Sequence, residues 1–182
     1  HTTPNPISLN GLLSEMVNEG CTHCFMEVSS HAIVQNRIHG IQFKGGVFTN
    51  ISHDHLDYHR TFDAYIKAKK KFFDDLSSDA FALVNIDDKN GSVMLQNTLA
   101  QKYNFALKTP ADFKAKIIEN DISGLILNMD GKEFYSRLIG RFNAYNLLTV
   151  FATATLLGED KLIILSALSN LSSVDGRFQY VK

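Results

Sequence analysis

Apolar residues recur with helical spacing in some segments of the chain and form short runs in others. Positions 9, 12, 13, 16 and 17 are apolar, which predicts a helix that begins near Ser8 and ends at Gly20. Short apolar runs predict strands at 24–28, 45–51, 81–87 and 103–107, and helices are expected at about 61–76 and 91–101. This alternation predicts an α/β fold, with a largely parallel sheet flanked by helices.

The region from about 113 to 139 has a different pattern. Runs at 113–119, 124–129 and 132–139 are strand-like, and the dipeptide Asp130-Gly131 is a strong signal for a hairpin turn. A small antiparallel appendage to the parallel sheet is therefore expected here. Helical spacing then predicts two further helices, at 142–157 and 160–171. We expect residues 1–182 to form one domain that includes this appendage.

The helix expected at 61–76 contains four lysines. At about 100° per residue, Lys69 lies in the middle of a stripe of apolar side chains, whereas Lys67 and Lys71 lie on the opposite face and Lys70 to one side. Lys67, Lys70 and Lys71 are therefore expected to be solvated. Burial of an ammonium is costly and lowers its pKa. Lys69 either extends its ammonium to water or is kept as a neutral amine for chemistry, and the spacing alone leaves both open.

The composition is that of an ordinary globular protein. Apolar residues make up 45% and charged residues 20%, and the net charge of −1 gives no attraction to nucleic acid or to an anionic membrane. No apolar run is long enough to span a membrane and no secretory signal is visible, so a cytoplasmic protein is expected. Cys21 and Cys24 are expected to be reduced, buried thiols, because no second Cys-x-x-Cys pair completes a zinc site.

Polar residues follow three of the predicted strands. Ligands of α/β proteins gather at the carboxyl ends of parallel strands. One cleft is therefore expected to collect Glu27, Ser29, His55 and Asp87.

His55 belongs to the run HDHLDYH at 53–59, which is open to three interpretations. The histidines could simply belong to a polar loop. The run is also close to the H-x-H-x-D-H zinc motif of metallo-β-lactamase-type hydrolases, from which it differs by the extra Tyr58. In the third interpretation, His55, Glu27 and a modified Lys69 bind magnesium, which prefers oxygen ligands and so requires the modification.

Several strings in this chain occur together, in the same order, in one known family. They are TTP at 2–4, MEVSSHAIVQNRIHG at 26–40, VFTNISHDHLDYHRTFDAYIKAKKKFF at 47–73, GRFNAYNLL at 140–148 and DGRFQ at 175–179. With these strings the whole chain resembles the central domain of the Mur ligases, and most closely the members that add the third amino acid of the peptide. The resemblance implies a P-loop-type α/β fold.

The resemblance also implies a reaction. Such ligases use ATP and Mg²⁺ to convert the D-Glu carboxylate of UDP-MurNAc-L-Ala-D-Glu into an acyl phosphate, and the amine of a diamino acid then displaces phosphate to form an amide. The diamino acid is meso-diaminopimelate or L-lysine, and the product belongs to peptidoglycan synthesis. The difficulty of this chemistry is that two anions must be brought together, which metal ions and fixed dipoles make possible.

Residue roles follow from the resemblance position by position. Glu27 and His55 match magnesium ligands, and Lys69 matches a lysine that becomes carbamylated, which turns a cation into an anion with two oxygens. These three residues are the expected catalytic and metal-binding set. The expected substrate-binding residues are Thr2, Thr3, Ser29, Gln35 and Arg37. The expected nucleotide-binding residues are Asn143, Asn146 and Arg177, although, on sequence alone, a helix cap and a polar first turn explain Asn143 and Asn146 better.

One motif of the family is not present in this sequence. The phosphate loop G-x-x-G-K-[ST] does not occur, so the backbone amides and lysine that bind ATP phosphates are missing. We therefore expect this chain to be an internal part of a longer, monomeric ligase and to be inactive alone, with a sheet edge open to self-association. The alternatives are a zinc-dependent hydrolase and a non-catalytic binding module with the same fold.

Overall fold

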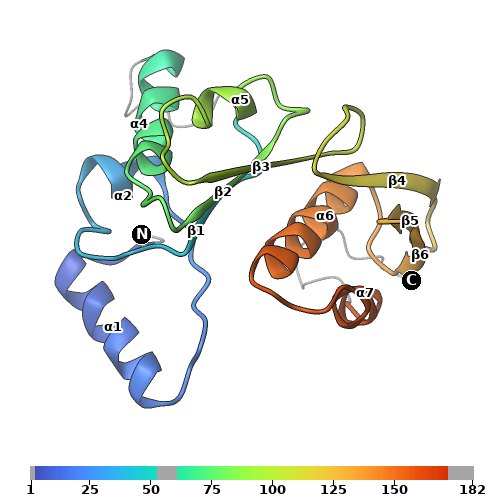
Figure 1. Ribbon diagram of the computed structural model, residues 1–182, viewed down its shortest axis with the longest axis horizontal. Helices are drawn as coiled ribbons and strands as arrows, with labels where there is room; N and C mark the ends of the chain where they lie inside the picture. Colours follow the sequence, from blue (N-terminus) through green and yellow to red (C-terminus); the bar gives the residue numbers. More distant parts are fainter. Residues whose placement is uncertain (1–2, 53–60, 172–182) are drawn as a thin grey trace. The chain divides into compact units, whose positions relative to one another are not determined.

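The computed structural model describes residues 3–52 and 61–171 of the 182-residue chain. Six strands are hydrogen-bonded to one another in their order along the chain (Figure 1). They are β1 (Gly45–Phe48), β2 (Phe81–Asn85), β3 (Gln101–Ala106), β4 (Phe113–Asn120), β5 (Leu125–Met129) and β6 (Lys132–Ser136). The helices are α1 (Pro6–Asn18), α2 (Ser30–Val34), α4 (Phe62–Asp74), α5 (Gly91–Met94), α6 (Arg141–Leu156) and α7 (Lys161–Ser169).

The sheet is parallel from β2 to β4 and antiparallel from β4 to β6. At the two ends of β2, Gln101 N donates to Ala80 O at 2.9 Å and Ile86 N donates to Phe105 O at 3.1 Å, so β2 and β3 advance in the same direction. The pairing of β3 with β4 is also parallel, whereas β4 with β5 and β5 with β6 are antiparallel. The predicted α/β class, with a small antiparallel part at its end, is confirmed.

The chain divides into two compact units, which we describe separately. Unit 1 comprises residues 1–46, 51–82 and 93–101, and unit 2 comprises residues 47–50, 83–92 and 102–182.

In unit 1, the helices α2 and α4 pack against each other. Thr61 caps α4, since its hydroxyl accepts a hydrogen bond from Ala64 N at 3.2 Å. The buried face of α4 includes Tyr65 and Phe73, which are 5% and 3% exposed. Gly46 permits this packing, because a Cβ there would lie 2.8 Å from the ring of Phe72.

The helix α1 contributes little to the core of unit 1. Leu9 is its buried residue, whereas Val17 is 70% exposed and the apolar residues Leu12 and Met16 are also exposed. Most of the apolar stripe that predicted this helix is therefore uncovered within the described chain.

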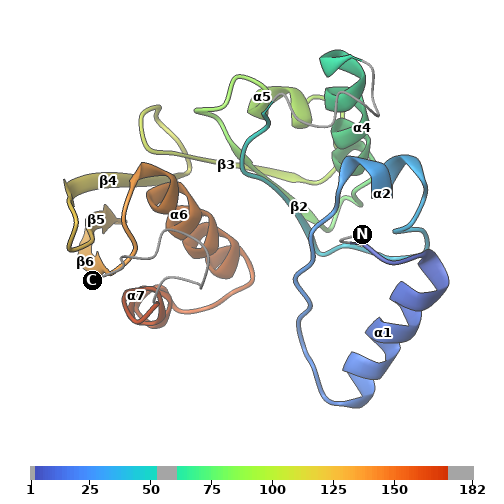
Figure 2. The ribbon, with the colours of Figure 1, turned by 180° about the vertical axis from the view of Figure 1, so that it is seen from behind.

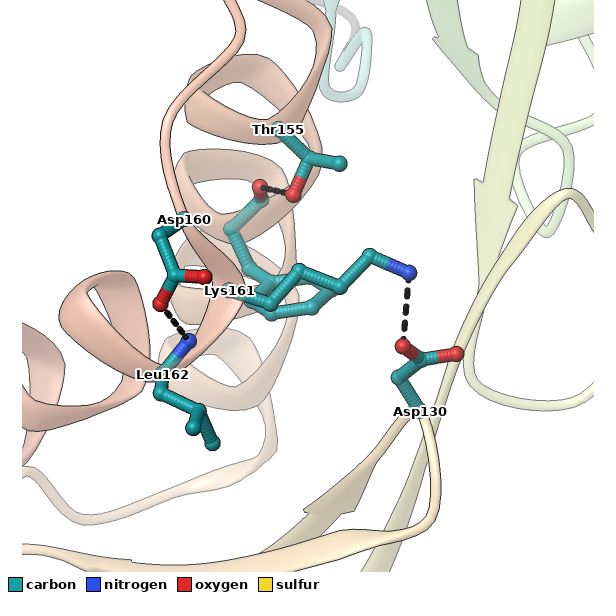
Figure 3. A network of polar contacts seen from close by, with 6 residues as sticks. Asp130, Thr155, Asp160, Lys161 and Leu162 are labelled. Carbon is teal, nitrogen blue, oxygen red and sulfur yellow. Dashed lines mark hydrogen bonds and ion pairs between the residues drawn. The ribbon is translucent and has the colours of Figure 1, made fainter.

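In unit 2, α6 lies against β4 and β5 in both views (Figure 1, Figure 2), and α7 packs against α6 and β6. The turn between β5 and β6 has positive φ at both Asp130 (54°) and Gly131 (76°), as a tight hairpin requires. Asp160 caps α7 by accepting from Leu162 N at 2.9 Å, and Lys161 forms an ion pair with Asp130 at 2.6 Å (Figure 3).

Four local features differ from what the sequence predicted. Residues 24–28 are not a strand, and the helix expected at 91–101 is confined to α5. The short helix α2 was not predicted at all. Cys21 and Cys24 are free thiols, as expected, but both are exposed rather than buried. Among the described residues, no helix is long and apolar enough to cross a membrane.

Candidate functional site

The four lysines of α4 have different surroundings. Lys67 forms an ion pair with Asp63 at 2.7 Å, Lys70 with Asp74 at 2.5 Å, and Lys71 with Asp75 at 2.6 Å. Each partner lies four residues away on the same helix, which is the spacing that brings opposite charges together. Among the described residues, no ion pair involves Lys69.

The prediction that Lys67, Lys70 and Lys71 are solvated is correct for two of them. The side chains of Lys67 and Lys71 are 74% and 57% exposed, but that of Lys70 is only 12% exposed. Lys70 lies to one side of the helix, where its methylene groups are covered while its ammonium still reaches Asp74. Its burial is therefore compensated by a partner, which distinguishes it from Lys69.

Lys69 is half-buried on the apolar face of α4, as the helical spacing predicted. Its ammonium lies over the ring of Tyr65, one turn earlier, with Nζ 5.4 Å from the ring centroid. Burial lowers the pKa of Lys69, and the negative charge of Glu27 opposes this only in part. Lys69 is thus a lysine with a lowered pKa that lies in the electrostatic field of Glu27.

Four residues expected to form the site are joined by hydrogen bonds within unit 1. The Thr3 hydroxyl donates to Glu27 O at 3.1 Å, and Arg37 Nη1 donates to Thr3 O at 3.0 Å. The same guanidinium donates to Gln35 Oε1 from Nε at 2.9 Å and from Nη2 at 2.5 Å. Because Thr3 is 1% exposed, it acts as a buried link that fixes the backbone at Glu27 relative to Arg37.

Ser29 has a clear structural role next to this network. Its hydroxyl accepts a hydrogen bond from Ala32 N at 3.2 Å and so caps α2. The sequence SSH that follows Glu27 is therefore the start of a helix that ends just before Gln35 and Arg37. The hydrogen bonds of Thr3 then connect the backbone at Glu27, before this helix, with Arg37 after it.

Asn143 and Asn146 lie in the first turns of α6. Asn143 Nδ2 donates to Ile139 O at 2.8 Å, and Asn146 Nδ2 donates to Asn143 Oδ1 at 3.3 Å. Gly140 occupies the N-cap position and has no side chain to cap the helix, so Asn143 closes the turn from inside the helix. The polar first turn that the sequence suggested is thus present.

Asp87 was expected among the acidic residues of the cleft, but its carboxylate is already occupied. It accepts hydrogen bonds from three consecutive amides, those of Leu107, Lys108 and Thr109, and from the hydroxyls of Thr109 and Tyr145. Burial alone would raise the pKa of Asp87, but these hydrogen bonds outweigh it and hold that pKa well below its ordinary value. A carboxylate with five donors has no lone pair left for a metal ion.

Three of the expected site residues, Thr2, His55 and Arg177, lie outside the described residues, as does the whole HDHLDYH run. Among the described residues, no group of three metal-ligating side chains is preassembled. Glu27 and Lys69 are therefore the two members of the expected metal-binding set whose surroundings can be described.

Sequence reasoning missed two residues that the structure connects to the expected site. Tyr65 lies under the ammonium of Lys69, and Tyr145 connects α6 to Asp87. The signal for Tyr65 was its position four residues before Lys69. Nothing in the sequence pairs Tyr145 with a residue 58 positions away.

Comparisons with known proteins identify the family of this chain. The family model described as Mur ligase middle domain matches residues 1–154. The chain is 62% identical over 179 residues to the UDP-N-acetylmuramoyl-L-alanyl-D-glutamate–2,6-diaminopimelate ligase of Cytophaga hutchinsonii, and 54% identical over 182 residues to the ligase of that name from Parabacteroides distasonis. In both cases it spans 98–100% of its own length but only 37% of the relative's.

Solved structures show the same relationship. A structure of a UDP-N-acetylmuramoyl-L-alanyl-D-glutamate–2,6-diaminopimelate ligase superposes with a TM-score of 0.88 at 29% identity, over 100% of this chain and 39% of that one. A structure of MurF from Acinetobacter baumannii, at 19% identity and a TM-score of 0.70, covers 78% of this chain and 32% of its own and shares the fold. The chain belongs to the Mur ligase family, and its first 154 residues match the middle domain of that family.

Proposed function

We propose that this chain is the middle part of an ATP-dependent ligase that joins 2,6-diaminopimelate to the D-Glu carboxylate of UDP-MurNAc-L-Ala-D-Glu in peptidoglycan synthesis. The support is the 62% identity to a relative with that name, over nearly the whole chain. The chain spans 37% of that relative, and we propose that the whole ligase is a longer protein. We further propose that it is cytoplasmic and acts as a monomer.

The single observation that favours chemistry over simple binding is the environment of Lys69. The ammonium is half-buried, has no ion pair among the described residues, and lies in the field of Glu27. A neutral amine adds to CO₂ and loses a proton, giving an N-linked carbamate. Burial favours the neutral amine and so makes Lys69 the reactive one of the four lysines.

We assign Glu27, His55 and the carbamate of Lys69 as the magnesium-binding set. A carbamate and a carboxylate supply the oxygen ligands that Mg²⁺ prefers. Bound Mg²⁺ would neutralise the charge that ATP and the substrate carboxylate bring together. Glu27 fits this role because the residue is exposed, while its backbone is held by the hydrogen bond from the Thr3 hydroxyl.

The remaining assignments concern the two substrates. Thr2, Thr3, Ser29, Gln35 and Arg37 are assigned to the muramoyl-peptide end of the site, with the Arg37 guanidinium as the partner for an anionic group. The buried Thr3 serves this end of the site by holding Arg37 and the backbone at Glu27 in place. Asn143, Asn146 and Arg177 bind the nucleotide. The fork of Arg37 already points its donors at oxygen atoms of Thr3 and Gln35, so its orientation is set before any substrate is present.

The test is phosphate release from ATP by the longer protein. We expect release only when UDP-MurNAc-L-Ala-D-Glu and one amino acid are both present, with meso-diaminopimelate active and L-lysine inactive. If L-lysine supports release with the dipeptide and meso-diaminopimelate does not, the proposed amino acid is wrong but the ligase activity is supported. No release with either amino acid, from a folded protein, would leave a binding module as the better proposal.

The role of Lys69 is tested by comparison with its neighbours. Lys69→Ala removes a metal-binding group, and we expect activity to fall by at least about 100-fold. Lys67→Ala removes an exposed lysine of the same helix and should leave activity within about twofold. Equal losses in the two variants would show that the helix, rather than the amine of Lys69, is what matters.

The zinc-hydrolase alternative finds no support in the family match. Its histidines lie outside the described residues. Stoichiometric zinc in the purified protein would be the observation that revives it.

A further inference from the structure

The carboxylate of Asp87 is the point where three segments of unit 2 meet. Asp87 lies two residues after the end of β2, and its own amide donates to Asn85 Oδ1 at 3.0 Å, which fixes the turn. Its Oδ2 accepts from Leu107 N at 2.8 Å and from Lys108 N at 2.9 Å, which holds the loop after β3. The third segment is α6, which reaches the same Oδ2 through the Tyr145 hydroxyl at 2.8 Å.

The bond from Tyr145 is strong and persists over a wide pH range. A hydroxyl that donates to an ionised carboxylate makes a charge-assisted hydrogen bond. Burial, together with the bond to Asp87, raises the pKa of Tyr145 to about 12, so the phenol keeps its proton at any physiological pH. Neither partner changes its charge under conditions in which the enzyme works.

The position of Tyr145 on α6 gives this bond a consequence for its neighbours. Tyr145 lies between Asn143 and Asn146 in the sequence, at about 200° around the helix from the first and about 100° from the second. A side chain fixed on one face of a helix sets how far the helix is rotated about its axis. That rotation determines where Asn143 and Asn146 point, and these two residues are further coupled by their own hydrogen bond.

We propose that Asp87 and Tyr145 are positioning residues for the nucleotide end of the ligase site, because their hydrogen bond fixes the rotation of α6 and hence the direction of Asn143 and Asn146. The inference rests on the proposed function, since it needs Asn143 and Asn146 to contact ATP. Asp87 and Tyr145 themselves act only through α6 and do not touch the substrates.

The experiment uses Tyr145→Phe in the longer protein, which removes one hydroxyl and keeps the ring. We expect the KM for ATP, and the Kd for a non-hydrolysable ATP analogue, to rise about fivefold or more, as for loss of a hydrogen bond to a charged group. The kcat should stay within about twofold, and the KM for the UDP-muramoyl dipeptide should not change. Asp87→Asn keeps one acceptor oxygen and should give a smaller rise in the KM for ATP. In the double variant the KM for ATP should be only slightly higher than in Tyr145→Phe, because both substitutions break the same hydrogen bond.

The matched control is Tyr135→Phe. The Tyr135 hydroxyl also donates a hydrogen bond, to the backbone carbonyl of Ser123, but it lies on β6 and is not connected to α6 by any described bond. This variant should leave the kinetic constants for both substrates unchanged.

Two results would overturn this inference and leave the proposed ligase function unaffected. One is unchanged ATP constants in Tyr145→Phe with a lowered melting temperature, which would make the bond purely structural. The other is a parallel change in kcat and in the KM values of both substrates. A wild-type protein that binds no ATP and releases no phosphate would instead overturn the proposed function, and the inference with it.

Discussion

Two charged residues of this chain, Lys69 and Asp87, have opposite electrostatic situations. Lys69 is half-buried without an ion pair to a described residue, and burial lowers its pKa. Asp87 is also partly covered, but five donors surround it and its pKa falls as well, which for a carboxylate favours the charged form. A lowered pKa thus makes Lys69 easier to convert to the neutral amine, whereas it makes Asp87 a permanent anion.

The helical spacing identified Lys69 because the relevant geometry is local. Its helix is periodic, so the apolar stripe can be drawn from the sequence. Lys70 was misjudged because it lies at the border of the stripe, where a small rotation of the helix decides burial. Asp87 was misjudged because its donors come from residues 20 and 58 positions away, and the sequence does not show which tertiary donors reach a carboxylate.

Replacing Asp87 should change how stability depends on pH. In the folded chain its pKa lies below the value of about 3.9 expected when unfolded, so ionised Asp87 stabilises the fold above about pH 4 and this contribution is lost as the pH falls further. We expect Asp87→Asn to lower the free energy of unfolding by about 2 kcal/mol at pH 7. The difference from wild type should shrink below about pH 4, as measured by urea unfolding at a series of pH values. A difference that stays constant down to pH 2 would contradict this assignment.

Elements were predicted well where their stabilising contacts lie within the element or next to it. The helix α4 has a capping threonine and a clear stripe, and the hairpin β5–β6 has a turn dipeptide suited to positive φ. Residues 24–28 have strand-forming side chains, but a strand needs a neighbour to pair with, and Phe25 in this segment is 73% exposed. The apolar pattern predicts the side-chain preference, whereas the presence of a partner strand is a property of the whole sheet.

The helix α7 provides a test of what holds an element in place. Asp160 accepts from two amides of the first turn, those of Leu162 and Ile163 at 2.9 and 3.1 Å, whereas the side chains of the adjacent pair Lys161 and Asp130 are 48% and 54% exposed. A cap of this kind contributes about 1 kcal/mol, and an exposed ion pair much less.

We therefore expect Asp160→Ala to lower the free energy of unfolding by about 1 kcal/mol and Lys161→Ala by less than about 0.5 kcal/mol. Denaturant unfolding of the two variants under the same conditions measures both. The reverse order would mean that the link from α7 to the β5–β6 turn, rather than the cap, stabilises this helix.

At the scale of the whole molecule, the fold class and the family could be predicted, because strings typical of one family occur along the entire chain. The division into two compact units could not be predicted, since no composition change marks it. The exposure of the apolar residues of α1 could not be predicted either, because only contacts outside the helix decide whether its apolar stripe is covered. The predicted self-association through a sheet edge remains a prediction.

The absence of a phosphate-loop string from these 182 residues leads to a last prediction. Most of the charge of ATP is on its phosphates, and Asn143 and Asn146 carry no positive charge that could neutralise it. The chain alone should therefore bind Mg-ATP at least about 100-fold more weakly than the longer protein does, because it lacks backbone amides and a lysine aimed at the phosphates. Calorimetric titration of both proteins measures this difference, and a cooperative melting curve for the 182-residue chain serves as the control that it is folded. Equal affinities would place the phosphate-binding groups within this chain, and would favour Lys69 or its neighbours on α4 as ligands of the phosphates rather than of a magnesium ion.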